Sequence, residues 1–393
     1  MSLTNTPSSE RTHIAFFGCR NAGKSSLVNA VTGQELAVVS EIKGTTTDPV
    51  KKAMEILPLG PIVIIDTAGI DDEGELGNLR IEKTNQVLNK TDIAVLVTDC
   101  TRELNDYENK LINVFKERKL PYVIACNKSD LLSSTPKQED NKIYVSAKTG
   151  KNIYELKELL GRFLKENTQE KFIIFDKLNK SDTVILVIPI DESAPKGRLI
   201  LPQQLVLREL LDNHCTAVCC QVEELENTIK SLAKVNLVIT DSQAFKEVSK
   251  IVPENIKLTS FSILMARYKG ELEELVKGAR TIPELKDGDK VLISEGCTHH
   301  RQCNDIGTVK LPKLLEKTTG TKLDYSFTSG GEFPEDLSEY KLIIHCGACM
   351  LNETEMKNRI LKCKNSSKPI VNYGIALAYM NGILEKSLEI LEI

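Results

Sequence analysis

Residues 18–26, with the sequence GCRNAGKSS, constrain the fold of this chain more than any other stretch. The segment follows the strand-like run HIAFF and precedes the helical pattern SLVNAVTG, so it is expected to join a strand to a helix. In such a loop glycines let backbone N–H groups approach phosphate oxygens, Lys24 neutralises the β- and γ-phosphates, and Ser25 offers its hydroxyl to Mg²⁺. The sequence therefore predicts a nucleotide-binding α/β domain.

Three further motifs indicate which nucleotide this domain binds. In DTAG (66–69), which ends the run IVIID, Asp66 can hold Mg²⁺ through water and the Gly69 N–H can meet the γ-phosphate. In NKSD (127–130), the Asp130 carboxylate can accept two hydrogen bonds from the edge of guanine, a pair that adenine does not offer. SAK (146–148) is expected to complete the base pocket. The motifs predict GTP rather than ATP, bound by Asn21, Ala22, Gly23, Lys24, Ser25, Ser26, Asp66, Gly69, Asn127, Lys128, Asp130, Ser146, Ala147 and Lys148.

The four motifs, in this order, resemble those of the translation-factor-type GTPases over about residues 11–165. The threonine run of KGTTTDPV (43–50) resembles the first switch of the Era and MnmE branch, which implies that Thr46 binds Mg²⁺, with Thr45 as the neighbouring candidate. Asn21 matches the asparagine by which some members of this branch recruit K⁺, and its alternative role is to cap the loop. Ile70 stands where Ras-type enzymes carry a water-orienting glutamine, so we expect slow unaided hydrolysis and a switch role.

Composition limits the remaining possibilities. With 393 residues, two or three domains are expected, and a net charge of −4 disfavours bulk nucleic-acid binding. No apolar run is long enough to cross a bilayer, and MSLTNTPSSERTH lacks an apolar signal region, so we expect a cytoplasmic protein with no membrane partner. The 11 cysteines are then expected to be core residues or metal ligands rather than disulfides. Residues 1–10 are expected to be a disordered lead-in.

Short apolar runs alternate with amphipathic stretches along the whole chain, which predicts an α/β fold throughout, with a last helix near 373–391. The middle region shows no catalytic motif, so its expected role is dimerisation, and its strands are expected at 184–190, 217–222, 237–240 and 256–260. Joints rich in polar or helix-breaking residues at 165–171 and 279–290 predict a GTPase domain at 11–168, a dimerisation domain at 172–278 and a C-terminal domain at 279–393.

Cysteines of the middle domain raise the alternative of a metal site, because Cys215, Cys219 and Cys220 lie beside His214. The stretch CTAVCCQV, however, is typical of a strand, in which successive side chains such as those of Cys219 and Cys220 point to opposite faces. We therefore expect these three thiols to be buried as small hydrophobic groups.

Two cysteine segments of the C-terminal domain each follow a buried-strand pattern. DKVLISEGCTHH places Cys297 and His299 after one strand, and YKLIIHCGAC places His345, Cys346 and Cys349 at the end of another. Because the C-terminal ends of parallel strands converge at one edge of a sheet, these five side chains are expected to meet. Three thiolates with one or two imidazoles suit Zn²⁺ and an iron–sulfur cluster equally.

A GTPase domain followed by CTH and a distant HCGAC resembles the HydF family of iron–iron hydrogenase maturation GTPases, over the whole chain. The resemblance implies GTPase, dimerisation and cluster-binding domains, with a 4Fe–4S cluster held by Cys297, Cys346 and Cys349. It also implies a scaffold that takes the two-iron subcluster precursor from the radical-SAM maturases HydE and HydG to apo iron–iron hydrogenase. His299 and His345 are candidates for the fourth ligand or for an outer role, and His300 adds a third imidazole.

A cluster with one iron that is not bound by a thiolate is suited to releasing a cargo, because the ligand on that iron can exchange. Cys303 is a weak reserve ligand, and Cys363 is expected to be structural. The state of the bound GTP is expected to bias partner choice or domain arrangement, in a homodimer or higher oligomer.

Two other function classes stay open at this point. The first is an RNA-directed GTPase of the Era or MnmE kind with a zinc site, which the acidic balance disfavours. The second is a redox enzyme that uses the cluster for electron transfer, which would require a fourth fixed cysteine.

Overall fold

The computed structural model describes residues 6–34, 50–67, 83–134, 136, 140–167, 171–190, 197, 199–296 and 306–392. The chain divides into two compact units, Met1–Gln169 and Glu170–Ile393. Both consist of helices and mainly parallel sheets, which confirms the predicted α/β fold class. Several residues that the sequence assigns to sites lie outside the described residues: Thr45, Thr46, Gly69, Ile70, Cys297, His299, His300 and Cys303.

The first unit contains a six-stranded sheet with the strand order β2-β3-β1-β4-β5-β6. β2 runs antiparallel to β3, and the other neighbouring pairs are parallel. The strands are β1 (Thr12–Phe17), β2 (Val50–Ile56), β3 (Gly60–Asp66), β4 (Ile93–Asp99), β5 (Tyr122–Asn127) and β6 (Lys142–Tyr144). The helices with described bounds are α1 (Lys24–Thr32), α3 (Asp106–Glu117) and α4 (Ile153–Asn167), with 3₁₀ turns at Ser8–Glu10 and Ser129–Leu131.

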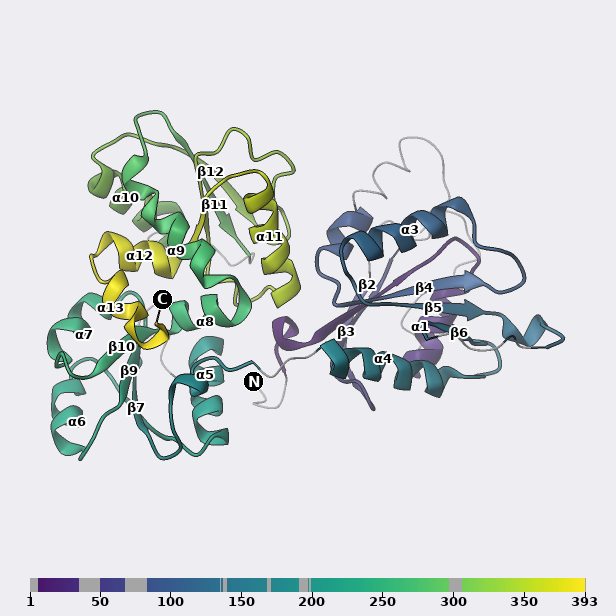
Figure 1. The fold of residues 1–393 in the computed structure, drawn as a ribbon, viewed down its shortest axis with the longest axis horizontal. Helices are drawn as coiled ribbons and strands as arrows, with labels where there is room; N and C mark the ends of the chain where they lie inside the picture. Colours follow the sequence, from purple (N-terminus) through teal and green to yellow (C-terminus); the bar gives the residue numbers. More distant parts are fainter. Residues whose placement is uncertain are drawn as a thin grey trace. The chain divides into compact units, whose positions relative to one another are not determined.

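Helices cover both faces of this sheet, as its nearly continuous apolar strands require. Ile14 and Phe16 of β1 belong to a core with α1 and α4, whereas Ala15 and Phe17 belong to a core with α3 (Figure 1). Because β1, β3, β4 and β5 are parallel or share parallel neighbours, their C-terminal ends lie at one edge. The predicted nucleotide motifs all follow strands that end at this edge.

The second unit begins with a four-stranded parallel sheet in the order β10-β9-β7-β8. Its strands are β7 (Thr183–Val187), β8 (Thr216–Cys220), β9 (Leu237–Thr240) and β10 (Lys257–Ser260), which fall on the four stretches expected from the sequence. A 3₁₀ turn at Phe175–Lys177 precedes them, and the helices are α5 (Leu201–Asp212), α6 (Leu225–Ser231), α7 (Phe245–Ile251) and α8 (Phe261–Lys269).

The thiols near β8 do not all behave as expected. Cys215 is buried, Cys220 is half-buried and Cys219 is exposed. The expectation of burial is therefore wrong for Cys219. The physical reason is the position of β8, which pairs only with β7 among the described strands and so forms an edge of the sheet.

A second four-stranded parallel sheet follows, in the order β12-β11-β13-β14. Its strands are β11 (Lys290–Glu295), β12 (Asp324–Ser329), β13 (Leu342–His345) and β14 (Ile370–Asn372). The helices are α9 (Leu272–Arg280), α10 (Leu311–Thr319), α11 (Glu353–Asn365), α12 (Tyr373–Met380) and α13 (Leu384–Leu388), with a π-helical turn at Ile306–Lys310 and 3₁₀ turns at Ile282–Glu284 and Glu389–Leu391. The single helix expected near 373–391 is thus divided, and Gly382 adopts a left-handed φ of 70° at the break.

The two sheets of the second unit have the same connectivity, and they share one hydrophobic core. In each sheet the first strand of the sequence lies between the second and the third. One cluster of buried residues joins Leu186 of β7 to Ile293 of β11 and Ile344 of β13. The site expected at the ends of β11 and β13 therefore lies where the connections leave the sheet in opposite directions, the usual ligand position in such folds.

Candidate functional site

The phosphate-binding loop after β1 is shaped by glycine. Gly23 precedes α1 with φ at 82°, and a Cβ atom at this position would lie 2.3 Å from the Asn127 side-chain nitrogen. Asn127 donates from Nδ2 to the Ala22 carbonyl oxygen at 3.0 Å. Asn21 also has a left-handed backbone, with φ at 61°. The loop is therefore held against the end of β5, and only glycine permits this approach.

Three predicted phosphate and Mg²⁺ residues meet at the start of α1. The buried Lys24 ammonium contacts an Asp66 carboxylate oxygen and the Thr67 carbonyl oxygen. Ser25 donates from its hydroxyl to the other Asp66 carboxylate oxygen at 3.3 Å. A hydroxyl beside a carboxylate presents the oxygen ligands that Mg²⁺ prefers, and Lys24 supplies positive charge for phosphate.

The base-recognition motifs also converge. Asn127 accepts from the Ala147 backbone N–H at 3.0 Å, and the exposed Asp130 accepts from the buried Ser146 hydroxyl at 2.6 Å. The Ser146 hydrogen bond lowers the pKa of Asp130, so this carboxylate is an ionised acceptor at neutral pH. NKSD and SAK therefore lie together at the expected base pocket, and the Ser26 and Lys148 side chains are exposed.

Lys128, the second residue of NKSD, binds a carboxylate of the sheet edge. Its ammonium lies 2.5 Å from an Asp99 oxygen. Burial acts to raise the pKa of Asp99, but hydrogen bonds from Lys128 and Thr101 outweigh it and lower the pKa to about 2. The pair fixes the end of β4 to the end of β5.

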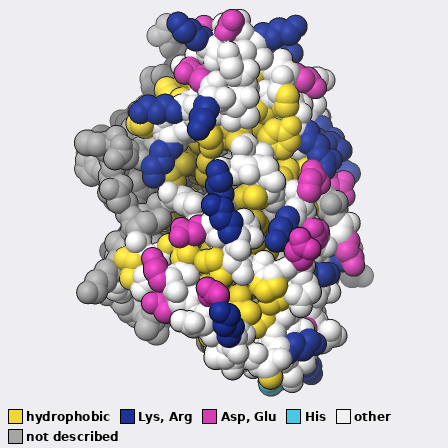
Figure 2. Space-filling view, turned by 90° about the vertical axis from the view of Figure 1, so that its left-hand side faces the viewer, with side chains coloured by type: hydrophobic (Ala, Val, Ile, Leu, Met, Phe, Trp, Pro, Cys, Tyr) yellow, Lys and Arg dark blue, Asp and Glu magenta, His cyan; other side chains and the backbone are white. Residues whose placement is uncertain are grey.

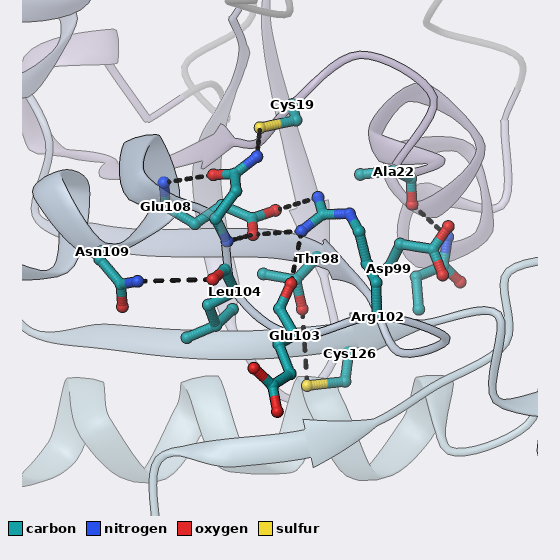
Figure 3. Close-up of polar contacts among 12 residues, drawn as sticks. Cys19, Ala22, Thr98, Asp99, Arg102, Glu103, Leu104, Glu108, Asn109 and Cys126 are labelled. Carbon is teal, nitrogen blue, oxygen red and sulfur yellow. Dashed lines mark hydrogen bonds and ion pairs between the residues drawn. The ribbon is translucent and has the colours of Figure 1, made fainter.

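The loop between β4 and α3 contacts the phosphate-binding loop in a way that the sequence motifs did not indicate. Arg102 donates to both carboxylate oxygens of the fully buried Glu108, at 2.8 and 2.7 Å (Figure 3). Asn105 caps α3 and donates from Nδ2 to the Cys19 sulfur at 3.2 Å. The spacing of Asn105 and Glu108 is that of a capping box, and this signal could have located the helix start.

In the second unit, the sulfur of Cys346 lies between the ends of β11 and β13. The Cys346 backbone N–H donates to the Ser294 carbonyl oxygen at 2.9 Å. Its sulfur accepts from the backbone N–H of Gly296 at 3.0 Å and from that of Ala348 at 3.4 Å. Gly296 immediately precedes Cys297 in the sequence, so the described backbone that leads to Cys297 contacts the Cys346 sulfur.

Cys349 is half-buried, three residues beyond Cys346. Burial raises the pKa of the Cys349 thiol, and the charge of Lys269 opposes this effect. The described part of the chain contains no group of three or more metal-ligating side chains, and Cys297 and His299 are not within that part. Cys363 is fully buried in α11, in keeping with the structural role expected for it.

Both ring nitrogens of the fully buried His345 have partners. Nε2 lies 2.9 Å from an Arg359 guanidinium nitrogen, and Nδ1 lies 2.8 Å from the Cys346 carbonyl oxygen. Because a guanidinium only donates, Nε2 is the acceptor and the proton is on Nδ1. Burial first and the Arg359 charge second lower the pKa of His345 to about 3, against the opposing effect of the Cys346 hydrogen bond. His345 is therefore neutral at physiological pH.

Arg359 belongs to a buried polar network that the sequence motifs did not indicate. On α11 it donates to Glu355 at 2.8 Å, one turn earlier, and to the Gly330 carbonyl oxygen at 2.9 Å. Its guanidinium carbon lies 5.2 Å from the centre of the Phe333 ring. The only sequence signal is the spacing of Glu355 and Arg359, and that spacing is common on exposed helices.

Comparison with known families assigns each part of the chain. Residues 173–270 match the hydrogen maturase F dimerization domain, and residues 273–390 match the hydrogen maturase F tetramerization domain. The chain belongs to the hydrogen maturase F family. Residues 13–128 match the family described as 50S ribosome-binding GTPase, so the first unit is a GTPase domain, with GTP or GDP and Mg²⁺ as its ligands. The two maturase domains identify a family whose members form oligomers.

Curated relatives share only part of the chain. The tRNA modification GTPase MnmE of Legionella pneumophila (strain Paris) is 37% identical over 147 residues, which cover 36% of this chain and 32% of MnmE. GTPase Der of Wolinella succinogenes is 34% identical over 161 residues, covering 37% of this chain and 34% of Der. The chain thus spans about a third of the length of these relatives. A crystal structure of Era with MgGDPNP and 16S ribosomal RNA nucleotides has 19% identity and a TM-score of 0.36, covering 61% of this chain and 97% of Era.

The described surface of the second unit is mixed in character. On the face shown in Figure 2, Lys and Arg side chains lie among acidic and apolar side chains rather than in one continuous basic surface. Among the helices that the structure describes, none has the length and apolar character needed to cross a membrane.

Proposed function

We propose that this chain is a GTP-hydrolysing scaffold that binds a 4Fe–4S cluster and carries the two-iron subcluster precursor to apo iron–iron hydrogenase. The observation that carries the proposal is the Cys346 sulfur, which accepts N–H groups from Gly296 and Ala348 in a chain of the hydrogen maturase F family. Hydrogen bonds to sulfur stabilise a metal-bound thiolate and tune a cluster.

The residues present fit such a group. Cys346 and Cys349 lie on one short loop at the end of a parallel strand, and Cys297 follows the residue that donates to Cys346. We assign these three cysteines as ligands, with His299 as a candidate for the fourth position. When bound, the cluster would supply an iron with an exchangeable site, the chemistry needed to dock and release a metal-bound cargo.

His345 is better suited to an outer role than to the fourth position. A direct bond to iron would require Nε2 to leave Arg359 or Nδ1 to leave the Cys346 carbonyl. Either change would leave a buried polar group without its hydrogen bond, at a cost of about 1–3 kcal/mol.

In the GTPase domain, Lys24 would neutralise the phosphates, while Ser25, Asp66 and Thr46, or its neighbour Thr45, would position Mg²⁺. The Lys24–Asp66 contact supports this assignment, because it places the Asp66 carboxylate at the end of β3 beside the Lys24 ammonium at the start of α1. Hydrolysis would be slow and promoted by K⁺ at Asn21, and the γ-phosphate would bias the choice of partner.

The partners would be the radical-SAM maturases HydE and HydG, which supply the precursor, and the apo-hydrogenase, which receives it. The protein would act in the cytoplasm as a homodimer or higher oligomer when it transfers the precursor between these partners. The two maturase domains support the assembly, since each is described by the contact it forms between chains.

Anaerobic purification followed by iron and sulfide analysis tests the cluster assignment. We expect about four irons and four sulfides per chain, and Cys346→Ser or Cys349→Ser should lose most of both while GTP hydrolysis persists. Cys219→Ser is the matched control, because this thiol is exposed in the same unit. Zinc in place of iron and sulfide, or full iron retention in the Cys346 variant, would contradict the assignment.

A further inference from the structure

Two buried cations lie at the two ends of the cysteine loop, residues 345–351. Arg359 of α11 is 4% exposed and contacts His345 at the start of the loop. Lys269, the last residue of α8, is 3% exposed and donates to the Leu351 carbonyl oxygen at 3.3 Å at the end of the loop. Burying a cation is costly, so two at one short loop indicate a specific use.

We propose that Arg359 and Lys269 are positioning residues of the cysteine loop: Arg359 fixes the tautomer by which His345 anchors Cys346, and Lys269 holds the other end at the Leu351 carbonyl oxygen and places a buried positive charge beside the loop. The inference rests on the proposed function, because it concerns the loop assigned to the cluster.

Arg359 acts through His345. The guanidinium can only donate, so its contact at Nε2 leaves Nδ1–H to donate to the Cys346 carbonyl. Glu355, the Gly330 carbonyl oxygen and the Phe333 ring hold the guanidinium in place. The Nδ1–H group of His345 is thereby held in a fixed position, and its hydrogen bond fixes the orientation of the Cys346 carbonyl in the loop.

Lys269 acts on the second half of the loop. It reaches Leu351 from α8, the helix that follows β10 of the preceding sheet, so residues from both halves of the second unit hold the loop. A metal-bound thiolate adds negative charge at this place, and a buried cation offsets it.

A purely structural role for the Arg359–Glu355 pair is the competing explanation, and the histidine tautomer distinguishes the two. In ¹⁵N–¹H spectra of the metal-free full chain, His345 should show only the Nδ1–H tautomer, and His345→Gln assigns its signals among the 5 histidines. The double variant Glu355→Gln/Arg359→Met, which leaves no unpaired charge, should lose this single tautomer. Glu353→Gln/Lys357→Met is the matched control, because it removes a more exposed pair of the same spacing from the same helix.

The reduction potential of the loaded protein tests Lys269. Lys269→Met should shift the midpoint potential downward, because a positive charge that favours the reduced cluster is lost, whereas Lys269→Arg and the control Lys357→Met should leave it near the original value.

Four results would overturn all or part of this inference. An Nε2–H tautomer in the unaltered chain, or an unchanged tautomer in the double variant, would overturn the role of Arg359. An unshifted potential in Lys269→Met would overturn the role of Lys269. Unaltered protein that takes up no iron would overturn the proposed function and the Lys269 role together, while the tautomer result would stand independently.

Discussion

The nucleotide pocket and the cysteine loop both follow the C-terminal ends of parallel strands, yet their cations contact different kinds of group. In the pocket, Lys24 contacts Asp66 and Lys128 contacts Asp99, so each cation has a carboxylate partner on a neighbouring strand. At the loop, Arg359 also has a carboxylate partner, Glu355 of the same helix. Both cations, however, reach the loop itself through a neutral group, since Arg359 contacts His345 and Lys269 contacts the Leu351 carbonyl oxygen. The ion pairs of the pocket therefore join its motifs to neighbouring strands directly, whereas the buried cations at the loop act on the chain through an imidazole and a carbonyl oxygen.

The largest effect is expected at the nucleotide pocket, where Lys24→Ala should slow GTP hydrolysis. We expect it to slow GTP hydrolysis by at least about 100-fold, because charge on the transferred phosphate loses its buried cation. Iron content should not change, since the P-loop and the cysteine loop belong to separate compact units. Turnover and iron analysis on the same preparation check both statements, and loss of iron would show that the sites are not independent.

Removal of Glu355 should be the largest stability effect at the loop. Glu355→Ala leaves the buried Arg359 without its carboxylate partner on α11, and we expect it to lower the free energy of unfolding of the second unit by about 3 kcal/mol. Glu226→Ala removes an exposed pair with Lys230 and should cost far less, because solvent screens that pair. Denaturant unfolding compares the two, and equal losses would remove the distinction between buried and exposed cations.

Asp99→Asn should have a smaller, pH-dependent effect in the nucleotide pocket. The folded pKa of Asp99 is about 2, below the ordinary value of 3.8, so its stabilisation is complete above pH 3.8 and is lost as the pH falls toward 2. At pH 7 the variant should be less stable by about 1 kcal/mol, after allowance for solvent screening. Unfolding of both proteins from pH 7 to pH 2 should show this difference shrink. A constant difference would contradict the ionic origin of the Lys128–Asp99 contact.

The smallest expected effect concerns the monovalent cation. GTP hydrolysis should be faster in K⁺ than in Na⁺, and Asn21→Ala should remove the difference between the salts. Asn21 has a left-handed backbone in the P-loop, so Asn21→Gly tests whether loop geometry alone accounts for a change. Equal rates in both salts for the unaltered chain would refute a potassium site at this residue.

The meeting of the nucleotide motifs at one edge of the sheet was predictable, because each motif is local in the sequence. Each motif follows an apolar run that forms a strand, and parallel strands bring their ends to one edge. The sequence also placed Cys346 and the residue before Cys297 at neighbouring strand ends, where the structure joins Gly296 to the Cys346 sulfur. Strand positions in the middle domain followed equally from short apolar runs.

Features that depend on the order of strands in a sheet, or on contacts with side chains distant in the sequence, were not predictable. The exposure of Cys219 follows from the position of β8 at an edge, and strand order is not written in the strand itself. Similarly, the role of His345 depends on Arg359, which lies 14 residues away on the next helix. Nothing in the spacing HCxxC indicates whether the imidazole faces a metal or a guanidinium, because both arrangements use a nitrogen lone pair.

The central claim, that this chain delivers a two-iron precursor through its cysteine loop, is tested most directly by activation of apo iron–iron hydrogenase. Protein purified anaerobically from cells that also express HydE and HydG would be mixed with the apo-hydrogenase, and hydrogen evolution would be measured. We predict activation by the unaltered chain and by Cys219→Ser, and none by Cys346→Ser. Full activation by Cys346→Ser, or none by the unaltered chain, would contradict the claim.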